Sequence, residues 1–401
     1  MNRSPDRASI AERLTRYVAI DSTNPALDNG VGEGEMGTAV AADLEKLGAR
    51  VVRQQVQPGR DNIIGYFDVS PDLPTIVLDA HLDTVPASAT MAPGGWRDGV
   101  LFGRGACDNK GSLVAMIEAV RLATADGRNP GANLVLLGSV DEEVTVRGAE
   151  AVLPLLGNAD LILVAEPTNL DVGTWHKGTT RFTIDAIGRS AHSSMPELGD
   201  NAIMHMGEVL ARIASTIQPR LNAVLASTGE TCKMSVGAIS GGGPLNLVPH
   251  ACRLGIDVRR VPGQSTDDVL AVFDTELADL IATGHVRRNA PSIASPAFET
   301  SAGPELTELL VSVAREQGAP SREIGLPFGT NANRIARLGA PTFIVGPGHI
   351  RHAHTDEEQI ALDEVVQGAA YFAALIERAA PLLATAPPRR PVSESLRLGR
   401  G

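Results

Sequence analysis

The chain has 401 residues, of which 43% are hydrophobic and 20% charged, a composition typical of a soluble globular protein long enough for two domains. Its formal net charge is -12 and only 3% of its residues are aromatic, so nucleic acids and anionic membranes are not expected partners. The N-terminal stretch has no signal-peptide core, and no segment approaches 18 consecutive apolar residues. These features predict a cytoplasmic protein that does not span a membrane.

The three cysteines, Cys107, Cys232 and Cys252, are odd in number and widely spaced. This pattern favours reduced thiols packed in the core over a disulfide framework or a cysteine zinc site.

Short apolar runs alternate with helical patterns in the first part of the chain and again near its end. The predicted strands are 75–78, 134–137, 161–164 and 341–345, and the predicted helices are 35–47, 112–125, 148–156 and 305–316. Such alternation predicts an α/β fold in which helices cover both faces of a mixed sheet, giving three layers. We assign residues 1–177 and 292–385 to this larger domain.

The middle of the chain has a different order. The predicted elements are a strand at 180–186, a helix at 202–217, strands at 234–239 and 252–258, a helix at 266–281 and a last strand at 285–288. This β-α-β-β-α-β order predicts a ferredoxin-like α+β domain inserted at residues 178–291, acting as a lid or a dimerisation arm. The Pro/Arg-rich residues 386–401 are predicted to form a disordered tail.

Polar residues follow four of the predicted strands of the larger domain. They lie in HLD after residue 80, DEE after residue 140, EPT after residue 165 and GPGHIRHAH after residue 345. Ligands of open α/β sheets bind beyond the carboxyl ends of the strands, so the four segments should converge on one acidic pocket. Carboxylates and imidazoles suit zinc, manganese or cobalt, and such cations would relieve the repulsion within DEE.

Each of these features also has a simpler interpretation when it is taken alone. His81 and Asp83 are compatible with a local hydrogen bond, and the segment at 103–111 with a glycine-rich turn before a helix. Glu166 is compatible with a solvated loop acid and His354 with the start of a capped helix. Their occurrence together favours a metal site.

Seven segments in order carry a resemblance to a known family. They are LDAHLDTVP, GRGACDNKG, DEE, AEPT, KGTTRFTIDAIGRSAHSSMPELGDNAI, GGGPLNLVPHACRLGIDVRRVPG and GPGHIRHAHTDEEQI. The chain thus resembles, from about residue 8 to residue 380, the M20 family of di-metal peptidases and deacylases. That family includes acetylornithine deacetylase, succinyl-diaminopimelate desuccinylase and glutamate carboxypeptidase.

The resemblance implies two divalent metal ions, with Zn²⁺ expected and Co²⁺ or Mn²⁺ as alternatives. His81 and Glu166 would hold one ion, Glu143 and His354 the other, and Asp108 would bridge the two. It also implies a cis peptide bond after the bridging residue, between Asp108 and Asn109.

The resemblance further implies that Asp83 orients His81 and that Glu142 is the general base. Neighbouring residues at a strand end project in different directions, so Glu143 can coordinate a metal while Glu142 faces the bridging water. The pKa of a metal-bound water falls towards about 7, so Glu142 can take its proton and deliver it to the departing amine. The resulting hydroxide would attack the amide carbonyl.

Residues outside the metal cluster are assigned by the same resemblance. His192 would reach the active site of the other subunit of a homodimer, formed through the inserted domain, and donate to the tetrahedral intermediate. Asn246, Arg259 and Gly348 would contact the substrate, and the Arg259 guanidinium suits a carboxylate.

Three positions depart from the family pattern or leave a choice open. Asn331 stands where many relatives carry an acid, and His349 replaces a serine in the Gly-Pro-Gly segment. His352 competes with His354 as a ligand because residues two apart share a face of an extended chain. We favour His354 because it follows an alanine, as in the family.

The leading functional hypothesis is a metal-dependent hydrolase that cleaves the amide bond of small N-acyl amino acids, as acetylornithine deacetylase does. A metallo-dipeptidase or carboxypeptidase is the alternative within the enzyme class, since its substrates also carry an amide beside a carboxylate. The alternative from another class is a non-catalytic protein that binds amino-acid derivatives. A degenerate protein of that kind would be expected to lack Glu142 or a ligand, whereas every such position is filled.

Overall fold

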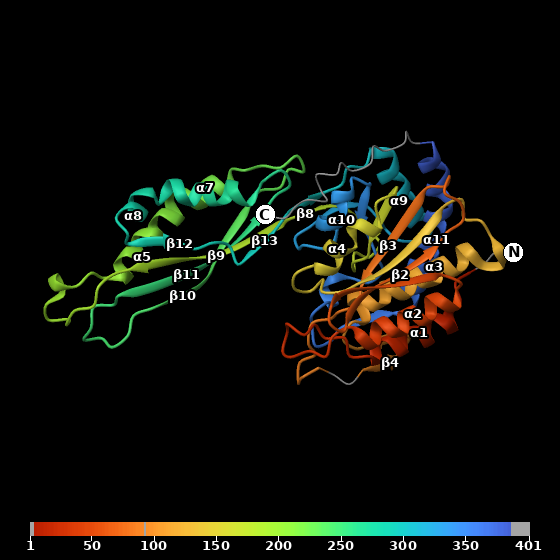
Figure 1. The fold of residues 1–401 in the computed structure, drawn as a ribbon, viewed down its shortest axis with the longest axis horizontal. Coiled ribbons are helices and arrows are strands. Elements are labelled where there is room, and N and C mark those ends of the chain that lie inside the picture. The colour runs from red at the N-terminus through yellow and green to blue at the C-terminus, as the bar shows by residue number, and fades with distance from the viewer. Residues whose placement is uncertain (1–3, 92–93, 386–401) are drawn as a thin grey trace. The chain divides into compact units, whose positions relative to one another are not determined.

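The computed structural model describes residues 4–91 and 94–385, and it divides into two compact units (Figure 1). The main unit ends its first segment at Thr174 and continues with Thr300–Gly325 and from Thr330 onward. The inserted unit comprises Trp175–Glu299 and Leu326–Gly329, where the sequence placed it at 178–291. The tail predicted at 386–401 lies outside the described residues.

A mixed sheet forms the centre of the main unit. Its strands follow the order β1 (Arg50–Gln57), β2 (Arg60–Phe67), β6 (Asn133–Ser139), β3 (Thr75–His81), β7 (Leu161–Val164), β16 (Thr342–Ile344), β8 (Val172–His176) and β14 (Phe298–Glu299), with β15 (Glu323–Leu326) also paired to β8. The neighbours β6, β3, β7 and β16 are parallel, whereas β1 and β2 are antiparallel at one edge. The four predicted strands are therefore confirmed, and all four belong to the parallel part.

Helices cover both faces of this sheet, which confirms the predicted three-layer α/β class. One face packs against α1 (Arg7–Ala19), α2 (Gly34–Lys46), α3 (Gly111–Thr124), α9 (Pro304–Glu316) and α11 (Leu362–Ala384), and the other against α4 (Arg147–Val152) and α10 (Ala332–Ile335). Successive side chains of a strand point to opposite faces of the sheet. Ile76 and Leu78 of β3 therefore point to the same face, where they pack in the core with the first set of helices. A small sheet of β4 (Gly95–Arg97), β5 (Val100–Phe102) and β17 (Gln359–Ala361) completes the unit.

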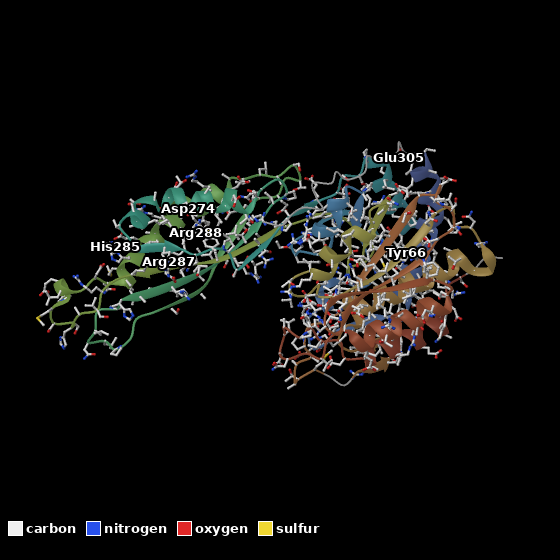
Figure 2. All side chains as sticks on the ribbon, in the orientation of Figure 1. Tyr66, Asp274, His285, Arg287, Arg288 and Glu305 are labelled. Atoms are coloured by element: carbon white, nitrogen blue, oxygen red, sulfur yellow. The ribbon has the colours of Figure 1, made fainter. Side chains whose placement is uncertain are left out.

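The inserted unit has the predicted β-α-β-β-α-β order. Its elements are β9 (Gly178–Ile187), α5 (Ala202–Arg212), α6 (Gln218–Asn222), β10 (Lys233–Gly241), β11 (Ala251–Arg260), α7 (Thr266–Glu276), α8 (Ala278–Ala282), β12 (Val286–Arg288) and β13 (Ile293–Ser295). The sheet order β10-β11-β9-β12 is antiparallel throughout, with β13 beside β9, and is the ferredoxin-like arrangement. An ion pair of 2.6 Å between Asp274 and Arg288, labelled in Figure 2, ties α7 to β12.

One face of the inserted sheet packs against its helices and the other is open. Burial alternates along β11, because Cys252, Leu254, Ile256 and Val258 point into a core that is separate from that of the main unit. Phe182 of β9 and Phe273 of α7 meet edge to face in this core, with ring centroids 4.9 Å apart. The edge strand β10 is exposed over most of its length.

The three cysteines are free and buried, as the sequence predicts. Within residues 4–91 and 94–385, none of the helices combines the length and apolar character needed to cross a bilayer.

Because the two units have separate cores, we expect Phe273→Ala to weaken the inserted unit selectively. Loss of the buried ring should lower the free energy of unfolding of this unit by about 3–5 kcal/mol. Hydrogen exchange read by mass spectrometry should then show faster exchange in β9 and β11, with β3 and β6 unchanged. Phe273→Leu is the matched control and should cost less, and equal acceleration in both units would contradict the division.

Candidate active site

The carboxyl ends of β3, β6, β7 and β16 lie along one edge of the parallel part of the main sheet. His81 is the last residue of β3, and Glu142 and Glu143 follow β6. Glu166 follows β7, and the loop that carries His354 follows β16. The convergence expected from the sequence is therefore a property of the fold.

Six of the predicted site residues come together at this edge. His81 Nε2 lies 3.0 Å from Asp108 Oδ1, and His354 Nε2 lies 3.1 Å from Glu143 Oε1 and 3.5 Å from Asp108 Oδ2. One potential ligand atom each from His81, Asp108 and Glu143 lies within 4.8 Å of the others, and the same holds for His81, Glu142 and Glu166. Both sets share His81, so the donors form one continuous cluster.

The cluster holds an excess of negative charge. Burial raises the pKa of Glu166 well above its ordinary value, and the charges of Glu142 and Asp108 raise it further. Burial and the neighbouring acids Glu143, Asp83 and Asp108 likewise raise the pKa of Glu142 well above its usual range, although His81 opposes them. Burial also raises the pKa of Glu143, against a hydrogen bond from His354 that lowers it. The carboxylate and imidazole donors fit a divalent cation, which would compensate this charge.

The environment of His81 fixes which ring nitrogen faces the cluster. His81 Nδ1 lies 2.9 Å from the main-chain oxygen of Asp83 and 3.6 Å from its carboxylate. A carbonyl oxygen only accepts, so Nδ1 carries a proton and donates to it, and Nε2 is the nitrogen that faces Asp108 and can bind a metal once it has lost its own proton. Asp83 thus contacts His81 most closely through its main chain.

The carboxylate of Asp83 holds the turn after β6. It accepts the main-chain N–H groups of Glu142 at 3.0 Å and Glu143 at 3.1 Å, and the amide of Asn24 at 2.7 Å. Burial alone would raise the pKa of Asp83, but the contacts with His81, Asn24 and the Glu142 N–H lower it. This buried carboxylate therefore stays ionised and positions both glutamates.

The first acid of the DEE segment has its own counter-charge. Asp141 accepts from Arg60 Nη2 at 3.0 Å and from Asn24 at 3.0 Å, and Arg60 also forms a two-pronged ion pair with Glu33 at 2.6 Å. The expectation that metal ions relieve the repulsion of all three acids therefore needs a correction. Arg60 balances Asp141, so Glu142 and Glu143 are the acids of this segment that face the cluster.

A second buried carboxylate holds the loop of Asp108. Glu358 Oε1 accepts the N–H groups of Cys107 and Asp108, each at 3.0 Å, and its other oxygen pairs with Arg104 at 2.5 Å. The peptide bond between Asp108 and Asn109 is cis, as the family resemblance implies. Asn109 then donates to the main-chain oxygen of Ala165 at 2.6 Å, which joins the loop to the end of β7.

Sequence reasoning missed Arg60, Asn24, Glu33 and the structural role of Glu358. Glu358 lies in the run 355–358, whose residue types are also typical of a helix start, so the sequence does not reveal its contacts with the Asp108 loop. Arg60 and Asn24 carry no local motif, and only the pairing of distant segments brings them under the site.

The residues around His354 make other contacts. His352 Nε2 accepts a hydrogen bond from Arg351 at 3.2 Å, and burial together with the positive charge of Arg351 lowers its pKa. His354, rather than His352, thus lies against Glu143 and Asp108. Gly348 has a φ of +83°, and a Cβ there would lie 2.7 Å from Cys107 Sγ, so close packing alone requires glycine.

Asn331 lies in the core and not among the cluster residues. Its amide donates to Asp79 Oδ2 at 3.0 Å and to Ser139 Oγ at 2.9 Å, on the strands that end in the site. Burial raises the pKa of Asp79 to about 6 despite these hydrogen bonds. An acid at position 331 would therefore face a buried carboxyl group, whereas the amide supplies a donor.

The other predicted site residues belong to the inserted unit. Ser193 N donates to Asn246 O at 3.0 Å, and His192 pairs with Leu247, so His192 and Asn246 share one corner. His192 Nδ1 accepts from Ser194 N at 3.1 Å, which places the proton of the neutral ring on the exposed Nε2. Arg259 pairs with Asp257 at 2.8 Å and lies opposite Thr179 at the other end of β11.

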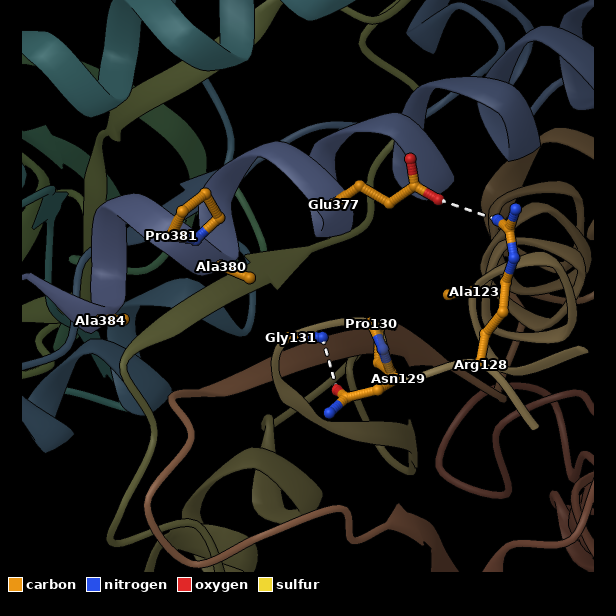
Figure 3. Close-up of a pocket in the computed structure, with 9 residues that line it drawn as sticks. All are labelled: Ala123, Arg128, Asn129, Pro130, Gly131, Glu377, Ala380, Pro381 and Ala384. Carbon is orange, nitrogen blue, oxygen red and sulfur yellow. Dashed lines mark hydrogen bonds and ion pairs between the residues drawn. The ribbon is translucent and has the colours of Figure 1, made fainter.

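A separate hollow of about 470 Å³ lies away from the cluster, between the loop before β6 and the end of α11 (Figure 3). Its polar lining includes the ion pair of Arg128 and Glu377 at 3.4 Å. Because the loop precedes β6, this hollow lies at the amino end of a strand whose carboxyl end carries the cluster.

Comparison with known proteins agrees with this geometry. The model of Peptidase family M20/M25/M40 matches residues 77–378. The chain belongs to this family. It is a hydrolase that acts on amide bonds, and the predicted membership of the M20 group is confirmed.

Two related proteins are named acetylornithine deacetylase. That of Myxococcus xanthus is 29% identical over 74% of this chain and 78% of its own length, and that of Edwardsiella ictaluri (strain 93-146) is 27% identical over 90% and 94%. Among solved structures, aminopeptidase PepT from Bacillus cereus ATCC 10987 has a TM-score of 0.79 at 20% identity and covers 94% of this chain and 99% of its own. The YXEP protein of Bacillus subtilis, described as a dinuclear metal binding peptidase, has a TM-score of 0.68 at 16% identity, with 94% and 98% covered.

In the metal-free protein, stability should fall as the pH rises from about 5 to about 8. The raised pKa values of Glu142 and Glu166 mean that the folded state binds more protons than the unfolded state, so the free energy of unfolding decreases with pH. The raised pKa of His81, caused by Asp108 and Asp83 against burial, acts in the same direction.

Thermal melts across this range with a chelator present would measure the slope. Glu166→Gln should make it shallower, and Glu308→Gln, on the exposed side of α9, is the matched control that should not. A slope that is identical in wild type and Glu166→Gln would contradict the repulsion inferred for the cluster.

Proposed function

We propose that this chain is a di-metal hydrolase that removes the acyl group from small N-acyl amino acids, as proteins named acetylornithine deacetylase do. The observation that carries the proposal is the convergence of three glutamates with raised pKa, one aspartate and two histidines on one strand edge. The two relatives with that name support the acyl substrate class, because the alignment with one of them covers 90% of this chain.

The assignment of ligands to two metals is the one that the family resemblance implies, and the distances within the cluster are compatible with it. His81 and Glu166 would bind one ion, Glu143 and His354 the other, and Asp108, which lies close to both histidines, would bridge them. This donor set suits Zn²⁺, with Co²⁺ and Mn²⁺ as alternatives. The dinuclear metal binding stated for the YXEP protein supports the same number of ions here.

Bound divalent ions would polarise the amide carbonyl and would lower the pKa of a water molecule. That water could then lose a proton near neutral pH and attack the carbonyl carbon. Glu142 is half-buried, and its main-chain N–H donates to Asp83, which fixes its position beside the other cluster residues. Its burial and acidic neighbours raise its affinity for a proton, as a general base working near neutral pH requires. Glu142 would therefore accept the proton of the attacking water and return it to the departing amine nitrogen.

The positions in the inserted unit support a site completed by a second subunit. The β11 register places Ala251 opposite Ile187 and Arg259 opposite Thr179. His192 and Asn246 adjoin the first of these ends, so they lie roughly 25 Å from Arg259 at about 3.3 Å per residue. One small substrate cannot contact both ends of a single inserted unit. We therefore assign Arg259 and His192 at one active site to different subunits, with Asn246 beside His192.

The inserted unit offers a surface for this homodimer. Its edge strand β10 leaves backbone groups unpaired on one side and exposes Val236 and Ile239. Ile203 and Met204 of α5 add exposed apolar area. We include in this proposal a lid role for the inserted unit and a substrate contact at Gly348. We also include a cytoplasmic location, which the three free thiols support.

The proposal is tested by amine release from N-acetyl-ornithine, other N-acetyl amino acids, N-succinyl-diaminopimelate and a set of dipeptides, with protein loaded with zinc or cobalt. Release from the N-acetyl amino acids at a higher kcat/KM than from dipeptides is the expected result. A preference for dipeptides would instead assign the chain to the peptidases. No release above that of Glu142→Gln would favour the non-catalytic alternative.

Glu142 and Glu143 should separate chemistry from metal binding. Glu142→Gln should lower kcat by roughly 10²- to 10⁴-fold, because it removes the proton acceptor, and should retain the metal content. Glu143→Ala should lose metal, measured by elemental analysis after dialysis. The reverse pattern would mean that the two roles are exchanged.

A mixed dimer tests the contribution of His192 across subunits. Glu142→Gln and His192→Ala are each expected to be inactive, but a dimer that contains one of each should regain one intact active site, because the unmodified Glu142 then meets the unmodified His192. Activity that returns on co-expression is the expected result. Mixed dimers that stay inactive would place His192 in the site of its own subunit.

A further inference from the structure

Two histidines and one aspartate of the inserted unit form a cluster that the proposed reaction does not use. His205 Nε2 lies 2.6 Å from Asp200 Oδ1, and His285 Nε2 lies 3.1 Å from Asp200 Oδ2. The two imidazole rings are stacked, with centroids 4.2 Å apart and planes at 10°. Both rings thus present the same nitrogen to one carboxylate.

Two segments supply the cluster, residues 200–205 and the turn before β12, and main-chain hydrogen bonds hold both beside the end of β9. Asp200 exchanges two main-chain hydrogen bonds with Arg189, at 2.8 and 2.9 Å. The main-chain oxygen of His285, labelled in Figure 2 where α8 leads into β12, accepts from Ile187 at 2.8 Å. His205 lies in the first turn of α5, which Asn201 caps with its side chain. The backbone therefore fixes all three positions before any ligand binds.

We propose that Asp200, His205 and His285 bind a first-row transition-metal dication, at a site separate from the proposed catalytic metals. One ligand atom from each residue lies within 4.8 Å of the others. Metal bonds of 2.0–2.2 Å in a tetrahedral site place neighbouring donors about 3.3 Å apart, so small side-chain rotations suffice to close the site. Two imidazoles and one carboxylate favour zinc, cobalt, nickel or copper over calcium or magnesium.

Exposure at the cluster leaves room for the remaining ligands. The side chains of Asp200, His205 and His285 are 32%, 16% and 40% exposed, so an ion held by them would keep a face open to water. Three protein ligands plus water is the coordination of an open zinc site. The ion would bind the loop before α5 to the turn before β12 and so brace the end of the inserted sheet.

Zinc is the probe for the test, and the full-length protein is used. After equilibrium dialysis against zinc and elemental analysis, His285→Asn and Asp200→Asn should each hold one ion fewer per chain than wild type. His250→Gln is the matched control, because His250 is an exposed histidine of the same unit whose ring contacts Ser190 instead. Circular dichroism confirms that each variant is folded, and the exposure of His285 makes its replacement the safer of the two.

A second readout does not depend on counting ions. Zinc should slow amide hydrogen exchange in residues 199–206 of wild type and leave it unchanged in His285→Asn. Equal zinc content in wild type, His285→Asn and Asp200→Asn would overturn the proposal, as would an equal loss in His250→Gln. Loss of the catalytic metals appears with Glu143→Ala instead, so failure of the proposed function is distinguishable from failure of this site.

Discussion

The repulsion among carboxylates at the edge of the main sheet is the constraint on which the rest of the site depends. Glu142, Glu143 and Glu166 are brought next to Asp108 because the strands that precede them, β6 and β7, run parallel on either side of β3, and burial raises the pKa of each glutamate. A fold that concentrates negative charge in this way stores unfavourable energy unless protons or a cation neutralise it. When a divalent ion binds at this point, it removes the repulsion between the carboxylates. The free energy of repulsion that is relieved on binding increases the affinity of the site for the ion.

The surrounding residues keep that charge in a fixed geometry without neutralising it. Asp83 and Glu358 each use a carboxylate to hold main-chain N–H groups, and these contacts set the directions of the Glu142 turn and the Asp108 loop. Arg60 and Arg104 are cations of this shell, but Arg60 contacts Glu33 and Asp141 and Arg104 contacts Glu358. Neither arginine therefore pairs with a carboxylate of the cluster in these contacts. The site is thus a cluster of negative side chains held in place by hydrogen bonds, which is how a protein preorganises ligands for a metal.

The parallel strands and the residues at their ends could be predicted because both depend on local patterns. Apolar runs at β3, β6, β7 and β16 each precede a polar motif, and geometry then requires the motifs to meet. Arg60 could not be found in this way, since β2 reaches the site by antiparallel pairing with β6 and the arginine has no motif of its own. The opposite ends of β11 occupied by His192 and Arg259 likewise follow from the observed register, which one sequence does not specify.

Proton release on metal binding tests the central claim most directly. Calorimetric titration of the metal-free protein with zinc at neutral pH, in buffers of different ionisation enthalpy, gives the number of protons displaced per chain. If burial and repulsion hold protons on Glu142 and Glu166, and the acids Asp108 and Asp83 hold one on His81, binding should release protons, and Glu142→Gln should release fewer than wild type. Tight binding without proton release, equal in wild type and Glu142→Gln, would contradict the charge balance from which the site and its function are derived.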